Sequence, residues 1–186
     1  MTSAPPPADA AFPAVTTILQ QAGELSEAGF AQLYPGHYLL VESLRYDDGS
    51  WRSFRTSTVE AVRRDQPRST LAVAPVAKRD QTNPYTWMIT IGRTRSNDIV
   101  LPDSSISKLH GWIRRRTDAQ GASTFSITDA GSRNGTFVNG AALRSETGAL
   151  PLGAHLRLGE VDSLFLDGVR LHRALRLPPN ALFHAA

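Results

Sequence analysis

The chain of 186 residues has no cysteine, only two lysines and no long apolar run. Without cysteine, neither a disulfide framework nor a thiolate metal site is possible, which fits a reducing compartment. No apolar stretch approaches the roughly 18 residues that a membrane-spanning helix needs. The N-terminal sequence MTSAPPPADA has neither the basic nor the apolar region of a signal peptide. These absences predict a cytoplasmic protein with no membrane contact.

Positive charge comes almost entirely from arginine, because Lys78 and Lys108 are the only lysines. The net charge of +3 fits an anionic partner, either nucleic acid or a phosphorylated protein, and fits an ordinary soluble surface equally well. The strongest basic run is Arg114-Arg115-Arg116. Alternate side chains of a strand face opposite sides, so this run does not form one continuous patch. A solvated hairpin is favoured there over a nucleic-acid contact.

Patterns typical of enzymes and metal sites fail on inspection. Residues 105–108 match the S-x-x-K signature of serine acylases, but the companion motifs are missing. The glycine-rich segment 131–136 lacks the Gly-Lys-Ser/Thr ending of a P-loop. The histidines do not have the spacing of metal ligands; they are His37, His110, His155, His172 and His184. We therefore predict a protein that is not an enzyme and has no cofactor or metal.

The N-terminal third of the chain carries no motif of known chemistry. Residues 1–13 are rich in Pro and Ala and are predicted to form a disordered tail. Apolar residues then recur near a helical period over 14–33, and two glycines leave open one broken helix or two short ones. A hairpin is predicted from 37 to 56 around the turn D-D-G-S. Residues 14–68 are thus an extension of helix plus β-hairpin that packs on the downstream domain or binds a partner.

Two local patterns in the extension predict a short helix and a site of phosphorylation. Ser57-x-x-Glu60 has the pattern of a capping box, which predicts a short helix through Arg64. Thr16 and Thr17 precede the first helix on a segment that we expect to be mobile. If phosphorylated, such a pair would act as an intramolecular ligand of high effective concentration for any phosphate-binding site downstream.

The larger part of the chain, residues 69–177, is predicted to be an antiparallel β-sandwich. It contains many short apolar or alternating segments separated by turn signals. The segment 71–76 reads as a strand whose proline suggests an edge position. Residues 109–128 read as a hairpin, and 168–177 as a short closing helix. Residues 178–186 are predicted to be a tail. The fold class is therefore mainly β, with an N-terminal helical and β-hairpin extension.

Four short signals follow one another within residues 89–140, each at a predicted strand end or loop. Their order and spacing resemble the forkhead-associated (FHA) domain, a module that binds phosphothreonine peptides. The resemblance covers roughly residues 69–167 and implies an eleven-strand-type sandwich with its binding loops at one end. The signals are Gly92-Arg93, Ser107-x-x-His110, Asp129-x-Gly131-Ser132-x-Asn134-Gly135-Thr136 and Asn139-Gly140.

The resemblance implies that Arg93 and Ser107 bind the phosphate. A guanidinium suits this role because it donates two parallel hydrogen bonds to phosphate oxygens, and a serine hydroxyl can donate another. Lys108 adds a second, more mobile charge. Gly92 lets the backbone turn sharply ahead of Arg93. Arg93 alone would read as a solvated loop arginine; its place among four motifs favours the phosphate role.

The resemblance gives Asn134 a different role, that of bridging the main chain of an extended peptide. Its side-chain amide has a donor and an acceptor in one plane. Ser132 and Arg133 precede it on the same predicted loop and are candidates for contacts with the phosphate or with peptide side chains. Asn-Gly is also a turn dipeptide, and a turn at 134–135 would present the amide.

The other motif residues are expected to support the site without touching the peptide. His110 invites a catalytic interpretation, but the matching histidine of the family braces the loops from beneath. Asn139-Gly140 is interpreted as a turn. The supporting residues are Gly92, His110, Gly135, Thr136 and Asn139.

The chain is therefore predicted to be a non-enzymatic phosphothreonine-peptide binding module in Ser/Thr kinase signalling. The expected partner is a phosphothreonine-containing protein or an autophosphorylated Ser/Thr kinase, and no contact with nucleic acid is expected. Phosphothreonine should be preferred over phosphoserine, because the family has an apolar slot for the methyl group. Two alternatives are a phosphate-independent adaptor on the same fold and an enzyme acting on phosphorylated substrates. The loop at 103–105 is expected to set the sequence preference, whose content stays open.

Overall fold

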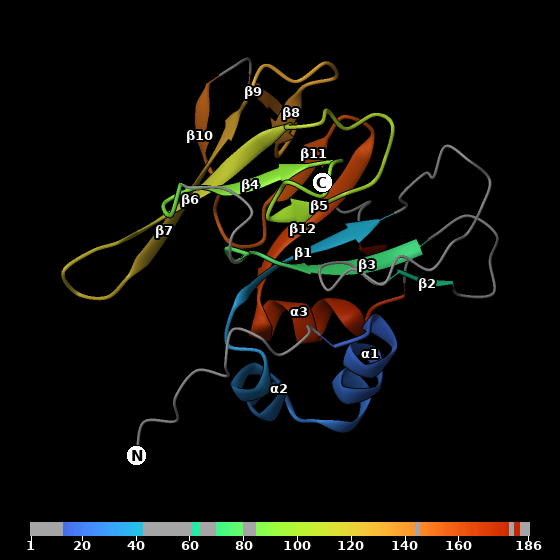
Figure 1. Ribbon diagram of the computed structural model, residues 1–186. Coiled ribbons are helices and arrows are strands. Elements are labelled where there is room, and N and C mark those ends of the chain that lie inside the picture. Colours follow the sequence, from blue (N-terminus) through green and yellow to red (C-terminus); the bar gives the residue numbers. More distant parts are fainter. Residues whose placement is uncertain are drawn as a thin grey trace.

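The computed structural model describes the chain in six segments, within which it forms three helices and twelve strands. The strands pack as two sheets in a sandwich, and the helices lie together at one end of it (Figure 1). This is the mainly β fold class that the sequence predicts. The described residues are 13–42, 61–63, 70–79, 85–143, 146–178 and 181–182.

The seven-stranded sheet has the order β2-β3-β1-β12-β11-β8-β9, and all its pairings are antiparallel. Its centre is the pairing of β1 with β12, which runs from His37 opposite Asp167 to Glu42 opposite Asp162. The strands are β1 (His37–Glu42), β2 (Ala61–Arg63), β3 (Thr70–Pro75), β8 (Thr136–Val138), β9 (Ala141–Leu143), β11 (His155–Leu158) and β12 (Val161–Asp167).

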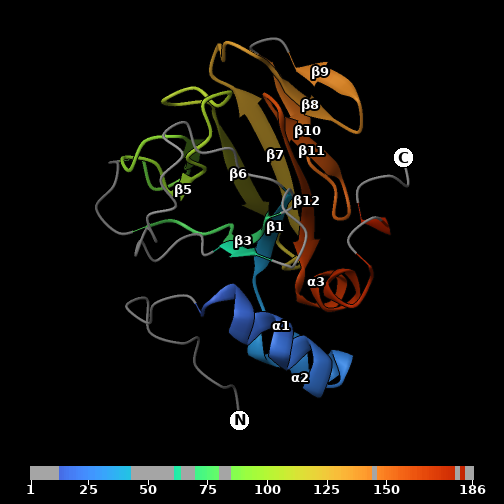
Figure 2. The same ribbon diagram turned by 90° about the vertical axis from the view of Figure 1, so that its right-hand side faces the viewer.

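The five-stranded sheet has the order β10-β7-β6-β4-β5. Its β6 and β7 form the hairpin predicted from the sequence, while the short β5 pairs parallel to β4. In Figure 2, β5 and β6 lie to the left of β11 and β12 of the other sheet, and β10 lies at the far side of β7. The strands are β4 (Ile89–Gly92), β5 (Ile99–Val100), β6 (Gly111–Thr117), β7 (Ser123–Asp129) and β10 (Thr147–Ala149).

The first hydrophobic core fills the space between the sheets. Leu39 of β1 and Phe165 of β12 meet Ile91, Ile113 and Ile127 from the five-stranded sheet, and all five side chains are fully buried. Each buried aliphatic or aromatic side chain of this size contributes about 1.5–3 kcal/mol to folding. The alternation of inward and outward side chains along β4, β6 and β7 therefore fixes their register.

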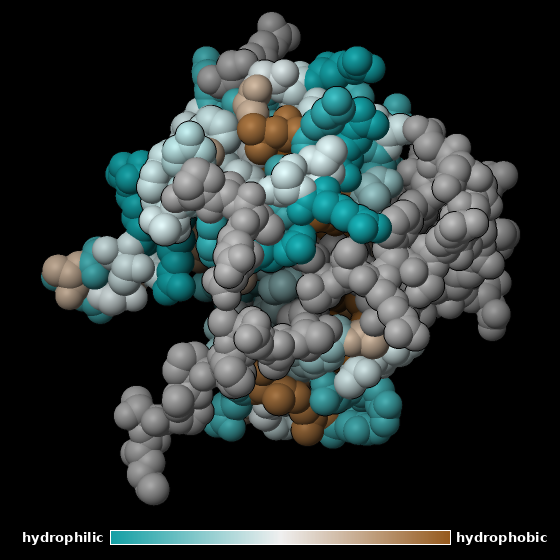
Figure 3. All heavy atoms as spheres, viewed as in Figure 1, coloured by the Kyte–Doolittle hydropathy of each residue, from teal (hydrophilic) through white to brown (hydrophobic). Residues whose placement is uncertain are grey.

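A second hydrophobic core lies on the outer face of the seven-stranded sheet. There α1 (Val15–Glu24), α2 (Glu27–Leu33) and α3 (Gly168–Leu175) bury Ile18, Phe30 and Leu171 against Leu40 and Val73. The helices stand at the bottom of Figures 1 and 2. They leave some apolar surface exposed, which is brown at this end of the molecule in Figure 3.

The N-terminal helical segment forms two short helices, one of the two arrangements that the sequence left open. Glu24 ends α1, and Leu25 is extended. Ser26 then starts α2, its hydroxyl accepting a hydrogen bond from Gly29 N–H at 3.2 Å. A serine in this position satisfies a backbone donor that the helix itself leaves unpaired. Thr16 and Thr17 are exposed in the first turn of α1, so they do not lie on the mobile arm that the sequence predicts.

The structure differs from the predicted extension at three further points. The predicted strand at 37–45 is β1, an interior strand of the sandwich that pairs with β3 and β12 rather than with residues 51–56, which lie outside the described residues. The predicted helix at 57–64 is wrong, because residues 61–63 form β2. The edge position predicted for β3 is also wrong, because β2 pairs with its first half; Pro75 lies beyond the reach of β2. Pairing within the seven-stranded sheet outweighs the local signal in each case.

Within the described ranges, none of the helices combines the length and the apolar character needed to cross a lipid bilayer.

Candidate functional site

The loops that carry the first three motifs lie at the end of the sandwich opposite the helices, whereas Asn139-Gly140 turns the chain at the other end of β8, beside His155. The segment joining β5 to β6 runs at the top right of Figure 1 and at the upper left of Figure 2, with the helices at the bottom in both. Since Thr16 and Thr17 belong to α1, they lie at the other end of the molecule from these loops.

Gly92 ends β4 at a point where two stretches of backbone nearly touch. A Cβ atom at Gly92 would lie 2.2 Å from Lys108 O and 2.7 Å from Asn97 Nδ2, so no other residue fits without moving the backbone. Arg93 follows and is exposed, and its N–H donates to Ser107 O at 3.0 Å. The glycine therefore allows the Arg93 loop and the Ser107 loop to lie against each other.

Asn97 holds the Arg93 loop from the inside. Its Nδ2 donates to Lys108 O at 2.7 Å and to Thr94 O at 2.9 Å, and only 2% of its surface is exposed. Thr94 Oγ1 also donates to Lys108 O, at 3.0 Å. The sequence analysis did not identify Asn97. The available signal was a polar Asn-Asp pair directly before an apolar strand, which usually indicates a turn.

Asp98 is a second buried brace that the sequence analysis missed. It is fully buried and accepts hydrogen bonds from Thr90 N–H at 2.8 Å and from Thr90 Oγ1 at 2.9 Å. Lys78 Nζ lies 3.1 Å from its carboxylate, and Arg79 N–H donates to it at 3.0 Å. A buried carboxylate is stable only with such partners. Asp98 therefore ties the segment after β3 to the beginning of the site.

His110 lies beneath the loops and joins two of them. Its Nδ1 accepts from Ser107 N–H at 3.2 Å, so the ring proton sits on Nε2, which lies 3.2 Å from Gly135 O and donates to it. The ring is fully buried, and this burial lowers the pKa of His110 despite opposing effects of the Gly135 hydrogen bond and the Asp129 charge. A neutral histidine in this position acts as a strut, as the bracing role predicted for it requires.

Asp129 organises the loop that carries Asn134. Its carboxylate accepts from Gly131 N–H and Ser132 N–H at 2.8 Å, and from the hydroxyls of Ser132 and Thr136 at 2.6 Å. Burial opposes ionisation, but the hydrogen bonds from Ser132 and Thr136 outweigh it and lower the pKa of Asp129. The carboxylate is therefore ionised at neutral pH.

Ser132 is predicted as a candidate for peptide contact, but its hydroxyl forms hydrogen bonds within its own loop. The hydroxyl donates to Asp129 and accepts from Gly135 N–H at 3.0 Å. Ser132 is also absent from the residues that line the pocket described below. Thr136 is fully buried, in keeping with its expected structural position.

Asn134 is exposed and reaches across to the neighbouring loop. Its Nδ2 donates to Ser105 O at 2.8 Å, and Oδ1 has no hydrogen-bond partner among the residues that the structure describes. Gly135 follows with a φ of 81°, which favours glycine and turns the chain toward β8. Asn139, at a φ of 48°, accepts from His155 N–H at 2.9 Å and so forms the expected turn. One amide acceptor is thus left open at the rim.

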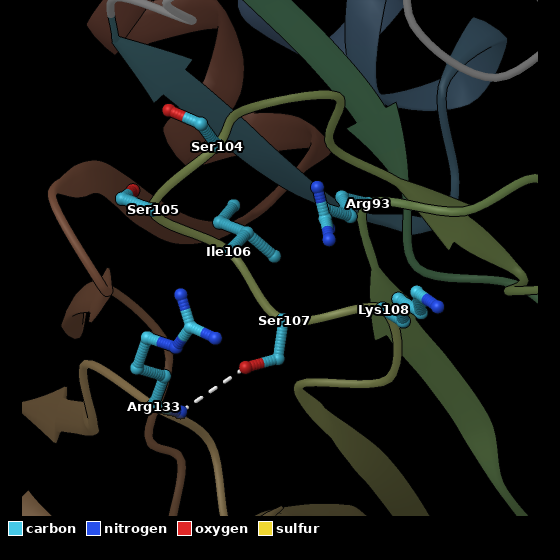
Figure 4. Close-up of a pocket in the computed structure, with 7 residues that line it drawn as sticks. All are labelled: Arg93, Ser104, Ser105, Ile106, Ser107, Lys108 and Arg133. Carbon is cyan, nitrogen blue, oxygen red and sulfur yellow. Dashed lines mark hydrogen bonds between the residues drawn. The ribbon is translucent and has the colours of Figure 1, made fainter.

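These loops enclose a pocket of about 200 Å³. Figure 4 shows Arg93 and Arg133 on the two sides of the segment that carries Ile106 and Ser107. Ser107 Oγ accepts from Arg133 N–H at 3.1 Å and keeps its own proton to donate. The pocket is lined by Arg93, Ser104, Ser105, Ile106, Ser107, Lys108 and Arg133.

A second hollow of about 340 Å³ adjoins the first. It shares Arg93, Ser104 and Lys108 with the first pocket. The rest of its lining is Thr94, Pro102 and Asp103. Asp103 does not present a free carboxylate there, because its Oδ1 accepts from Ser105 N–H at 2.8 Å and from Ser105 Oγ at 2.7 Å. The loop at 103–105 therefore lies beside the pocket, where the sequence analysis expects it to influence specificity.

The chemistry of the pocket suits an anion. Arg93, Lys108 and Arg133 bring three positive charges together, and none of them forms an ion pair within the described part of the chain. A phosphate monoester offers nearly two negative charges and three acceptor oxygens. The described residues contain no group of three or more His, Asp or Glu side chains able to hold a metal ion.

Comparison with known families identifies the region around the pocket. Residues 89–159 match the family model of the FHA domain. The match contains all four motifs from which the resemblance was inferred, and it confirms that resemblance.

Curated relatives are similar over less than half of this chain. An oxoglutarate dehydrogenase inhibitor of Corynebacterium diphtheriae is 35% identical over 81 residues, which are 44% of this chain and 52% of the relative. The ABC transporter ATP-binding/permease protein Rv1747 of Mycobacterium tuberculosis is 36% identical over 85 residues, which are 46% of this chain and 9% of the relative. The chain thus spans about half the length of the inhibitor and a small part of the transporter.

Solved FHA structures are similar as well. A crystal structure of the FhaA FHA domain complexed with the intracellular domain of Rv3910 is 24% identical, with a TM-score of 0.41, covering 69% of this chain and 98% of that one. A structure from work on phosphothreonine-dependent FHA domain interactions is 23% identical, with a TM-score of 0.41, and the match covers 70% of this chain and 95% of that one.

Proposed function

Because residues 89–159 form an FHA domain, we propose that this protein binds phosphothreonine-containing segments of other proteins and does so without catalysis. The observation that carries the proposal is the pocket in which Arg93, Lys108 and Arg133 gather around Ser107, where no carboxylate of the described residues forms an ion pair with them. The partners we propose are substrates of a Ser/Thr kinase or the autophosphorylated kinase itself, in the cytoplasm.

Each side chain has a distinct part in the proposed complex. Arg93 grips the phosphate through two parallel hydrogen bonds, and Ser107 donates its free proton to a third oxygen. Lys108 adds charge at the rim. Asn134 Oδ1 accepts from a backbone N–H of the extended peptide, while its Nδ2 stays on Ser105 O. Ser132 does not contact the peptide in this proposal. Its hydroxyl is bonded to Asp129 and so holds the loop that presents Asn134.

The methyl group of phosphothreonine is proposed to rest against Ile106, the apolar residue that lines the pocket. Burial of one methyl group contributes about 0.8 kcal/mol, so phosphothreonine should bind roughly fourfold more tightly than phosphoserine. Calorimetric titration of matched peptides measures this preference. Equal affinities would contradict the methyl contact and leave the phosphate contact standing.

A second candidate function, phosphate-independent regulation of an enzyme, is favoured by the names of two relatives. Both are oxoglutarate dehydrogenase inhibitors, from two species of Corynebacterium. An oriented phosphothreonine peptide library, followed by titration of the selected peptide before and after phosphatase treatment, separates the two candidates. Loss of binding after dephosphorylation supports phosphate recognition, whereas unchanged affinity supports the phosphate-independent adaptor.

A further inference from the structure

The outer faces of the two sheets differ. Helices cover the outer face of the seven-stranded sheet, whereas the outer face of the five-stranded sheet carries exposed aromatic and arginine side chains. Tyr85 and Trp87 are 53% and 50% exposed and pack edge to face, with ring centroids 6.3 Å apart. The guanidinium of Arg114 lies over the Trp87 ring, 5.2 Å from its centroid. Such a stacked arginine is held flat and keeps its hydrogen-bond donors free at the ring edge.

Strand β6 supplies the rest of this face. Ile113 points into the core, so its neighbours in the pleat, Trp112 and Arg114, point outward, and Arg116 continues the row. Opposite them on β7 stand Thr128 and Ser126, which are polar but uncharged. We call Tyr85, Trp87, Trp112, Arg114 and Arg116 the aromatic–arginine face.

The charge on this face is unbalanced. The outward positions of β6, β7 and β10 hold no carboxylate, because β7 and β10 present Thr, Ser and Ala there. Neither Arg114 nor Arg116 forms an ion pair among the residues that the structure describes. Arg115, between them, faces the other way and donates from Nε to Ser123 Oγ at 2.9 Å. Arg114 and Arg116 thus lie on one face without an ion pair among the described residues, and Arg115 lies on the other face with a hydrogen bond to Ser123.

The strand that carries much of this face starts close to the phosphate pocket in the chain. Gly111 begins β6 directly after His110, the strut of the site, and Leu109 beside Lys108 is 45% exposed. Arg114 stands three residues further along the strand, which is about 10 Å. A protein held by its phosphothreonine in the pocket therefore lies within reach of the face.

We propose that the aromatic–arginine face docks an acidic surface of the same protein whose phosphothreonine occupies the pocket. This inference rests on the proposed function. Tyr, Trp and Arg are the residues enriched at the centres of protein interfaces. Two free arginines suit a cluster of carboxylates better than a nucleic acid strand, which would need a longer basic stripe for its many phosphates. The pocket then selects the phosphorylated site, and the face selects the protein that bears it.

Two peptides test the proposal. One is a short phosphothreonine peptide; the other carries the same sequence joined through an eight-residue Gly-Ser linker to six glutamates, made with the tail at either end. Such a linker has a root-mean-square span of about 16 Å, longer than the roughly 10 Å of strand between Gly111 and Arg114. At about 0.05 M salt, the peptide whose tail is at the more favourable end should bind at least about tenfold more tightly than the short peptide. At about 0.5 M salt, the two peptides should bind equally.

Matched variants locate the effect. Arg116→Gln should reduce the gain from the tail, and the double variant Arg114→Gln with Arg116→Gln should remove it. Arg115→Gln makes the same charge change on the same strand but on the opposite face, and should retain the gain. All three variants should bind the short peptide with unchanged affinity, because none of these arginines lines the pocket.

Failure of the inference is distinguishable from failure of the proposed function. If the short peptide binds and the tail adds nothing, or if Arg115→Gln is as damaging as Arg116→Gln, the docking face is refuted. If the short peptide itself does not bind, the proposed function is refuted. The face is then tested with the glutamate segment as a separate peptide, whose binding should shift the indole NMR signals of Trp87 and Trp112. A twelve-nucleotide oligothymidylate that binds the face more tightly than the glutamate segment would overturn the choice of partner.

Discussion

The loop end and the helix end of this molecule are held in shape by different forces. At the loop end, buried polar side chains such as Asn97, Asp98 and His110 fix backbone that has no regular ladder. At the helix end, side chains such as Ile18 and Phe30 pack against the sheet, and hydrogen bonds such as that from Arg173 to Glu27 join the helices along their exposed sides. Packing is shared over many contacts, whereas each hydrogen bond has one geometry. The loop end should therefore be the more sensitive in binding, and the helix end in stability.

The largest effect should come from the helix end. Phe30 is fully buried, with its ring 4.5 Å from Tyr34 and 5.2 Å from His172 between centroids. Phe30→Ala should lower the free energy of unfolding by about 3–5 kcal/mol, measured by urea denaturation. Leu33→Ala, on the exposed side of the same helix, should change it by less than about 0.5 kcal/mol. A small loss for Phe30→Ala would mean that the helices do not stabilise the sheet.

The next effect should be confined to binding. Arg93→Ala removes the bidentate donor and should weaken phosphopeptide binding by about 2–5 kcal/mol, or roughly 30- to several-thousand-fold. Because Arg93 is exposed, thermal stability should change by less than about 0.5 kcal/mol. Arg93→Lys should rescue little, since an ammonium lacks the planar fork. Arg170→Ala on α3 is the control for loss of an exposed arginine; normal binding by Arg93→Ala would refute the phosphate role.

A brace should affect both properties together. Asn97→Ala removes a buried side-chain donor from Lys108 O and from Thr94 O, which keep one bond each from Thr94 Oγ1 and from the backbone N–H of residue 97, so stability should fall by about 1–2 kcal/mol. It also frees the loop that positions Arg93, so phosphopeptide affinity should fall too. Gln120→Ala, which removes an exposed side-chain amide from the turn between β6 and β7, should alter neither. If Asn97→Ala melted earlier but bound normally, Asn97 would support the fold without positioning the site.

The smallest effect concerns pH. Burial lowers the pKa of His110 from 6.5, so the folded state favours the neutral ring. Its contribution to stability is complete above the unfolded pKa near 6.5 and is lost as pH falls through the lowered folded pKa. The free energy of unfolding should therefore decrease from neutral pH downward, with a smaller slope in His110→Gln.

Burial also lowers the pKa of His37, so this histidine adds a slope of the same sign. Urea denaturation of His110→Gln and of His37→Gln at several pH values separates the two contributions. A slope unchanged in His110→Gln would mean that His110 does not titrate between the folded and unfolded states.

The sequence predicted the residues at the pocket better than the framework behind them. Arg93, Ser107 and Asn134 stand next to glycines or within short spaced motifs, where local pattern is informative. Asn97 and Asp98 escaped because their role depends on Lys108 and Thr90, which only folding brings near. A polar pair before a strand looks the same whether it is solvated or buried.

The N-terminal third was predicted less well because pairing within the sheet, and not the local turn and capping signals, decides its structure. The turn signal D-D-G-S suggested a local hairpin for β1, yet β1 pairs with β12 from the other end of the chain. The capping box before β2 predicted a helix, yet β2 pairs with β3. In both places pairing within the seven-stranded sheet outweighs a local preference of about 1 kcal/mol.

The pairing of β1 with β12 has a consequence for how this domain can be connected. The two strands are neighbours along their whole length, so the chain enters and leaves the sandwich side by side, next to α2 and α3. The binding loops face the opposite way (Figure 1). A linker or another domain can therefore be fused at either side of this region without obstructing the pocket. Joining the helical ends and opening a surface loop would likewise give a circular permutant with its pocket intact.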